Sequence, residues 1–290
     1  MATKIWVGGT TGNTTTWATA GNWSPANAPA TGDDVIVPAN AAYAIAGADV
    51  SAALLLSFQI EKGCTVAIGS ATTPLKIDAD AIRLAGVGQQ FLDLNNPTSD
   101  VIVTQAAGDS NYRSGLNITG AGIAKLSVTL DSDQTVGVAT AGGETCTCSA
   151  FAISGSGSVE IGEGVSKVGG GAPDVSLVGG TVEAWCDLAS VVTGGTFTHQ
   201  VGDSTSITSL GGVLTINSAG TATLIVLAGG TLTMGPSAGT LTALQINGKG
   251  WTVNDPFGII TAAWEFVQCS PWDGVATVPA NLQWTPAAIS

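Results

Sequence analysis

Residues 179–234 read GGTVEAWCDLASVVTGGTFTHQVGDSTSITSLGGVLTINSAGTATLIVLAGGTLTM. Gly-Gly pairs begin at residues 179, 194, 211 and 229, so the spacing between them is short and nearly constant. After each pair comes a short segment in which apolar and polar residues alternate. This repeat of about 15–18 residues is typical of a solenoid, in which each repeat forms one coil and stacks on the next.

The four alternating segments, aligned on their glycines, separate into apolar and polar columns. The first apolar column contains Val182, Phe197, Leu214 and Leu232. The second, two residues later, contains Ala184, His199, Ile216 and Met234. The column between them contains Glu183, Thr198, Thr215 and Thr233. Because side chains alternate between the two faces of a strand, we expect the apolar columns to stack into one continuous core.

A second short strand precedes each glycine pair: DVSLV, SVVT, ITSL and TLIVLA. Similar segments of four to six residues run through the earlier sequence, from DVIVP at residue 34 to SVEIG at residue 158. We therefore predict an all-β solenoid with two or three strands per coil, joined at glycine corners and paired in parallel between coils. About 12 coils over residues 41–250 would make a rod of about 55–60 Å.

Charged residues are scarce, at 10% of the chain against roughly 25% in an average soluble domain. The 8 Lys and Arg residues are scattered and stand against 21 Asp and Glu. Without a basic cluster, we expect neither nucleic acid nor a membrane as a partner. After Ser190 the charged side chains are Asp203, Lys249, Asp255, Glu265 and Asp273.

The chain offers no obvious metal or cofactor ligands. The pair Cys146 and Cys148 would share one face of a strand, so we expect both to be buried and reduced. A zinc site would need two further Cys or His ligands nearby, and His199 is the sole histidine. His199 falls in the inner column, where a neutral, hydrogen-bonded imidazole would point inward, whereas a slip of one residue in the coil would turn it outward. We predict no metal and no cofactor.

Acidic residues do not form an evident catalytic set. Asp78 and Asp80, with Arg83 nearby, are best explained as a turn, and Glu160 and Glu163 as residues of a glycine corner. A polysaccharide-cleaving β-helix would need acids stacked on neighbouring coils, whereas Glu183 is followed by threonines in the next three coils. We therefore predict no catalytic residue and no enzymatic activity.

Tryptophans concentrate at the two ends of the chain: Trp6, Trp17 and Trp23 near the start, and four after residue 250. Because the open ends of a solenoid must be covered, we predict an N-terminal cap over residues 1–40. Residues 251–290 are predicted to form a separate β-rich module for docking or oligomerisation. Its candidate interface residues are Trp251, Trp264, Phe266, Trp272 and Trp284.

The opening motifs WVGG (6–9), GNWSP (21–25) and GDDVIVP (32–38) resemble the start of many right-handed parallel β-helix proteins. These include structural proteins of bacteriophage particles and autotransporter-like surface proteins. The resemblance implies a right-handed helix and assigns capping or structural roles to Trp6, Trp23, Pro25, Asp33 and Asp34. Asp33 and Asp34 are expected at the turn that leads into the first coil strand, Val35–Val37.

The resemblance also implies a function. We expect a non-enzymatic structural virion protein that decorates or cements the capsid as a homotrimer, in contact with the major capsid protein or other virion proteins. Its location would be the surface of the particle. The alternatives are a tailspike that recognises host glycans and a secreted adhesin. The opening residues MATKIW lack the basic and apolar regions of a signal peptide, which disfavours the adhesin.

Overall fold

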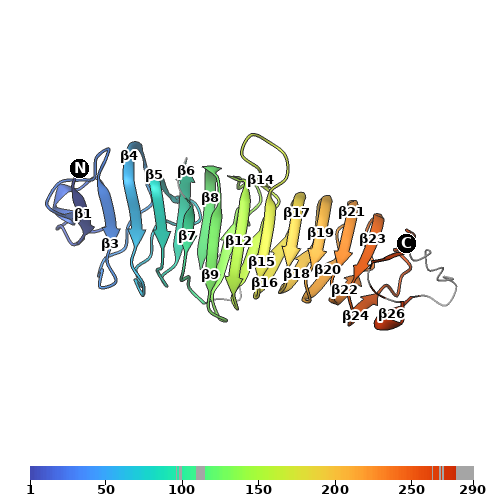
Figure 1. The fold of residues 1–290 in the computed structure, drawn as a ribbon. Helices are drawn as coiled ribbons and strands as arrows, with labels where there is room; N and C mark the ends of the chain where they lie inside the picture. Colours follow the sequence, from blue (N-terminus) through green and yellow to red (C-terminus); the bar gives the residue numbers. More distant parts are fainter. Residues whose placement is uncertain are drawn as a thin grey trace.

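The computed structural model describes residues 1–95, 97, 100–108, 115–262, 264–267, 269 and 271–278. The chain forms an elongated rod with β1 at one end and β26 at the other (Figure 1). It is a parallel β-solenoid of about 11 turns, which confirms the predicted all-β fold. At about 4.8 Å per turn, the rod is about 50 Å long. The described residues contain no α-helix, and their two 3₁₀ turns are η1 (Ala20–Asn22) and η3 (Pro271–Asp273).

One long ladder, here ladder 1, runs the length of the rod, and all its strands pair in parallel. Its strands are β1 (Thr3–Trp6), β3 (Asp34–Val37), β4 (Asp49–Ile60), β5 (Leu75–Leu84), β7 (Val101–Val103), β9 (Leu126–Leu130), β12 (Ala150–Gly155), β15 (Asp174–Val178), β17 (Leu188–Thr193), β19 (Ser204–Ser209), β21 (Ala222–Leu227), β23 (Leu241–Asn247) and β25 (Trp264–Val267). The second strand of each predicted repeat lies in this ladder.

A second parallel ladder, ladder 2, starts from the first halves of β4 and β5. Its further strands are β6 (Gln90–Asn95), β8 (Leu116–Ile123), β10 (Thr135–Val138), β13 (Ser158–Ile161), β16 (Thr181–Ala184), β18 (Thr196–His199), β20 (Val213–Ile216), β22 (Gly230–Met234), β24 (Trp251–Asn254) and β26 (Val275–Thr277). A short third ladder joins the end of β8 to β11 (Cys146–Cys148) and β14 (Val165–Ser166).

The register confirms the apolar columns predicted from the sequence. Val182 pairs with Phe197, which pairs with Leu214, which pairs with Leu232, and the second column pairs in the same way. Both columns are buried, whereas the polar column between them is partly exposed. The inner apolar stack is therefore continuous from coil to coil.

The glycine pairs form the corners between ladder 1 and ladder 2, where successive backbones come very close. A Cβ atom added to Gly195 would lie 2.6 Å from the carbonyl oxygen of Gly180. A Cβ atom on Gly212 would lie 2.0 Å from the carbonyl oxygen of Gly195. Since real Cβ contacts are longer than this, the corner repeats glycine because each coil rests on the backbone of the one before.

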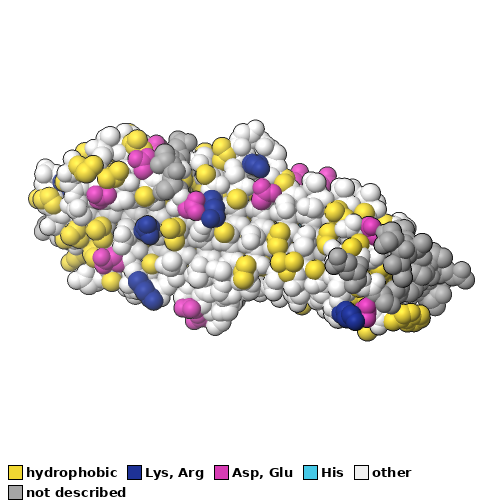
Figure 2. All heavy atoms as spheres, viewed as in Figure 1, with side chains coloured by type: hydrophobic (Ala, Val, Ile, Leu, Met, Phe, Trp, Pro, Cys, Tyr) yellow, Lys and Arg dark blue, Asp and Glu magenta, His cyan; other side chains and the backbone are white. Residues whose placement is uncertain are grey.

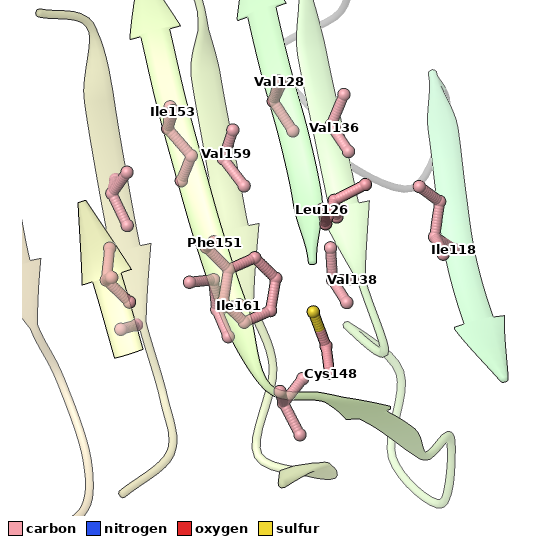
Figure 3. Close-up of a cluster of buried hydrophobic side chains, with 14 of the residues drawn as sticks. Ile118, Leu126, Val128, Val136, Val138, Cys148, Phe151, Ile153, Val159 and Ile161 are labelled. Carbon is pink, nitrogen blue, oxygen red and sulfur yellow. The ribbon is translucent and has the colours of Figure 1, made fainter. Parts of the chain in front are cut away.

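Apolar side chains from the facing ladders fill the interior along the whole rod. Figure 3 shows one section, in which Leu126 and Val128 of ladder 1 meet Val136 and Val138 of ladder 2, with Phe151 stacked on the next coil. The cluster of buried residues extends from Trp6 to Phe266 without a break into separate cores. One hydrophobic core thus runs the length of the described chain.

Candidate functional site

The N-terminal cap is built around three buried indoles. The rings of Trp6 and Trp23 are 5.0 Å apart, and those of Trp17 and Trp23 are 4.7 Å apart, in edge-to-face geometry. The Trp6 indole nitrogen donates to the carbonyl oxygen of Tyr43 at 2.8 Å, and that of Trp23 donates to the carbonyl oxygen of Trp17 at 2.7 Å. The cap therefore combines apolar burial with satisfied polar atoms.

A small antiparallel strand covers the outer edge of the first coil. This strand, β2 (Trp23–Ser24), pairs with β1, and Pro25 follows it directly. Because proline has no backbone N–H to donate, it ends a ladder and protects the edge against further pairing. Trp23 and Pro25 thus occupy capping positions, while the first ladder strand is β1 rather than the predicted Val35–Val37 segment.

The loop that precedes β2 is held by Asn22, whose side chain is fully buried. Its Nδ2 atom donates to the carbonyl oxygens of Asn13 at 2.6 Å and Thr16 at 2.9 Å. Its Oδ1 atom accepts from the backbone N–H of Thr10 at 3.0 Å. Asn22 was not among the residues predicted to cap the solenoid, although it lies inside the motif GNWSP.

Asp33 fastens the start of the chain to the turn before β3. Its carboxylate accepts from the backbone N–H of Ala2 at 2.7 Å and of Ala30 at 3.2 Å. Burial disfavours the charged form, but these two bonds, together with the positive charges of Lys4 and the N-terminus, outweigh it and hold the pKa of Asp33 below its usual value. Asp34 instead accepts from the Ser57 hydroxyl on the next coil. Both residues therefore have structural partners.

At the other end, three of the predicted interface residues lie in the core. Trp251, Trp264 and Phe266 are buried, with ring centroids of Trp251 and Trp264 6.2 Å apart and those of Trp251 and Phe266 5.9 Å apart. Strand β24 pairs with β22 and β25 pairs with β23, so the ladders continue past residue 250. Residues 251–267 therefore extend the solenoid, and these three side chains do not present an outer surface.

The remaining two interface candidates differ from these. Trp272 is 88% exposed, on the 3₁₀ turn η3. Trp284 lies outside the described residues. Of the five predicted interface residues, Trp272 is thus the one that the structure places on the surface.

The histidine and the cysteines have the predicted structural roles. His199 is buried, its Nε2 atom lies 3.1 Å from the carbonyl oxygen of Cys186, and burial lowers its pKa. Cys146 and Cys148 are buried on one face of β11 and are free. Burial raises the pKa of both thiols, that of Cys148 to about 12, so they are poor nucleophiles at neutral pH.

Two predictions about the acidic residues are wrong. Asp78 and Asp80 lie within the continuous strand β5, not in a turn, because β5 bends from ladder 2 into ladder 1 without interruption. Glu160 lies in β13, not at a corner, and pairs in register with Glu183 of the next coil. Glu160 and Glu183 are therefore stacked on neighbouring coils. Glu160 belongs to the coil before the first aligned glycine pair, so the alignment did not include it.

Glu160 lies at a groove formed by three neighbouring surface depressions of about 320, 580 and 490 Å³. The first two share Glu144 and Thr145, and the second and third share Glu163 and Trp185. Asp93 lines the outer end of the first depression, and Asp187 lines the third. The described residues that line the groove include no Lys, Arg or His.

The groove lies where the solenoid changes width. The third ladder ends at β14, and the coils that follow contain strands of ladders 1 and 2. In ladder 2 the chain takes a much longer path from Ile161 to its partner Ala184 than from Ala184 to its next partner, His199. Trp185 follows β16 at this step. The groove thus arises because wide coils with a third strand meet narrow coils without one.

Hydrogen bonds fix two of the groove carboxylates. Both Glu144 oxygens lie 3.2 Å from Nδ2 of Asn117, and one also accepts from the backbone N–H of Ala141 at 2.9 Å. Asp187 accepts from the backbone N–H of Asp203 at 2.8 Å. Burial raises the pKa of Asp93, with Lys76 lowering it and Asp49 raising it further. The groove therefore presents oriented acceptors along its length.

Across the part of the chain that the structure describes, no three His, Cys, Asp or Glu side chains are grouped so that they could hold a metal ion. In the same residues, no helix has the length and apolar character needed to cross a membrane. Comparisons with protein-family models, with curated proteins and with solved structures find no match.

Proposed function

We propose that this chain is a non-enzymatic structural protein of a bacteriophage particle, which decorates or cements the capsid as a homotrimer of rods packed side by side. The resemblance of the opening motifs to phage β-helix proteins supports two parts of this proposal: the location on a phage particle and the assembly of three chains. The observation that supports association between chains is an exposed apolar surface on the narrow half of the rod, that is, on the coils after β14.

This surface, here the apolar corner, consists of Val178, Val192, Leu210 and Val213. Val178 and Leu210 are 71% and 57% exposed. Each directly precedes the glycine pair of its coil, and the two coils are two steps apart along the same edge of the rod. Because glycines occupy the corner itself, the backbone there is accessible to a neighbouring molecule. Exposed aliphatic side chains grouped in this way are typical of a protein contact.

The distribution of charge favours contact at the same place. Of the 21 acidic and 8 basic residues, 17 and 7 lie before Ser190, which leaves a net charge of −10 there and −3 in the remainder. Figure 2 shows few charged side chains on the face in view, and several of them lie next to one of opposite charge. Two copies of so acidic a chain repel each other least along the part after Ser190, where three of the four residues of the apolar corner lie.

The oligomeric state tests the proposal. Sedimentation equilibrium of the full chain should give three times the chain mass, and the double variant Val178→Glu with Leu210→Glu should give a monomer with an unchanged circular dichroism spectrum. The matched control, Leu54→Glu, changes an exposed leucine of the wide half and should remain trimeric. A monomeric wild-type protein, or a double variant that still forms trimers, would contradict the association.

The location on a particle needs a separate measurement. Quantitative mass spectrometry of purified particles should find this chain in many copies, comparable with the major capsid protein. A few copies per particle would instead favour a tailspike. Its absence from the particle would refute the virion role and leave the adhesin.

A further inference from the structure

The groove between the wide and narrow coils joins three neighbouring depressions that share lining residues. Its lining extends from Asp93 on β6 to Gly202 after β18. Five steps along ladder 2, at about 4.8 Å each, give it a length of roughly 24 Å along the rod. Each depression has a volume within the range of about 300–1,000 Å³ that is common for ligand sites. Its shape fits an extended chain better than a compact ligand.

The groove is lined by an aromatic ring and by carboxylates, both of which can contact a sugar. Trp185 lines two adjoining depressions and offers a flat apolar surface between them. Glu144, Glu160 and Glu163 line the central depression around it. A carboxylate oxygen accepts hydrogen bonds from hydroxyl groups, and an aromatic ring packs against the apolar face of a sugar ring.

We propose that this groove binds an uncharged oligosaccharide that lies along the rod, with one sugar ring packed against Trp185. Glu160 and Glu163 accept hydrogen bonds from its hydroxyl groups. An anionic polysaccharide is disfavoured because five carboxylates line the groove and no cation among the described lining residues offsets them. The five carboxylates alone would suit a basic peptide as well as a sugar. Trp185 favours the sugar, because it lines two adjoining depressions where an aromatic ring can pack against a sugar ring.

Binding of defined probes tests this site. Cellohexaose, maltohexaose and mannohexaose represent uncharged chains, hexagalacturonate represents an anionic chain, and hexalysine represents a basic peptide. Titration calorimetry of the full chain should detect at least one of the three neutral probes and neither charged one. Binding of hexagalacturonate or hexalysine alone, or of no probe at all, would overturn the proposal.

Variants then locate the site. Trp185→Ala should abolish binding of the neutral probe, and the near-isosteric Glu160→Gln should weaken it by roughly tenfold, as expected for a hydrogen bond to a charged group. The matched controls Trp272→Ala and Glu265→Gln change exposed residues near the C-terminal end and should bind like the wild type. Unchanged binding in both groove variants would refute the assignment.

The result does not depend on assembly of the rods, because all the lining residues come from one chain. The monomeric double variant at the apolar corner should bind the neutral probe as well as the wild type. Sugar binding without trimers would therefore support the groove and reject the proposed assembly. Trimers without sugar binding would support the assembly and reject the groove.

Discussion

Buried aromatic side chains pack near both ends of the rod, but in different settings. At the N-terminal end an added antiparallel strand covers β1, and the indole nitrogens of Trp6 and Trp23 both donate hydrogen bonds. At the C-terminal end Trp251 lies on a ladder strand, and its buried indole nitrogen has no hydrogen-bond partner among the described residues. Aromatic burial alone can thus continue a core, whereas covering a strand edge also needs backbone and side-chain partners.

Removing the central ring of the N-terminal cap should have the largest effect. Trp23→Ala leaves a cavity between Trp6 and Trp17 and is expected to lower the free energy of unfolding by about 3–5 kcal/mol. Urea denaturation followed by circular dichroism measures this change. The control Trp272→Ala removes an exposed ring and should change it by less than about 0.5 kcal/mol. A loss of unfolding free energy for Trp23→Ala as small as that expected for Trp272→Ala would show that the central ring of the cap does not stabilise the fold.

A smaller ring near each end should separate the two settings. Trp6→Phe loses volume and leaves the carbonyl oxygen of Tyr43 without its donor, so both changes destabilise. Trp251→Phe loses similar volume but also removes a buried N–H that no described residue satisfies, which offsets the loss. In urea denaturation Trp6→Phe should cost about 1–3 kcal/mol more than Trp251→Phe. A larger loss at Trp251 would reverse the comparison.

The carboxylate that ties down the N-terminus should give the smallest effect, visible as a pH dependence. Because the pKa of Asp33 is lowered in the folded protein, its contribution is complete above the unfolded value of about 3.9 and is lost as pH falls through the folded value. Between pH 6 and pH 3 the melting temperature of the wild type should therefore fall more steeply than that of Asp33→Asn.

The difference between the two proteins is the quantity to compare, because Asp78 and Asp93 act in the opposite direction. Burial raises the pKa of both, which favours the folded state as pH falls. Both carboxylates are present in wild type and variant and cancel in the comparison. Parallel melting profiles would mean that Asp33 does not hold the N-terminus in its charged form.

The sequence was most informative where the coils are shortest. From β16 to β22 each coil is little more than two strands and a glycine corner, so the pairing of Thr181 with Thr196 follows from the spacing of glycines. In the wide half, the chain from Val128 to its partner Ile153 is much longer, because loops and a third strand intervene. There the alternation of single strands was visible, but their register was not.

The same difference explains the errors at the candidate site. Glu160 pairs with Glu183 across a coil that lacks the regular spacing, so the stacked acids could not be recognised from the glycine alignment. Trp251 occupies an inward ladder position, yet its place in a tryptophan-rich segment suggested a surface module. The local sequence does not determine where Glu160 or Trp251 points, because pairing between residues far apart in the chain sets both positions.

The coils also separate the length of the molecule from the length of its chain. Each turn adds about 4.8 Å to the rod whether its path is short, as from Thr181 to Thr196, or long, as from Val128 to Ile153. Extra residues leave at the corners, as the loop between β14 and β15 does in Figure 1, and do not lengthen the rod. The protein therefore behaves as a molecular ruler graduated in turns, and gains or losses of whole turns would change its reach in fixed increments.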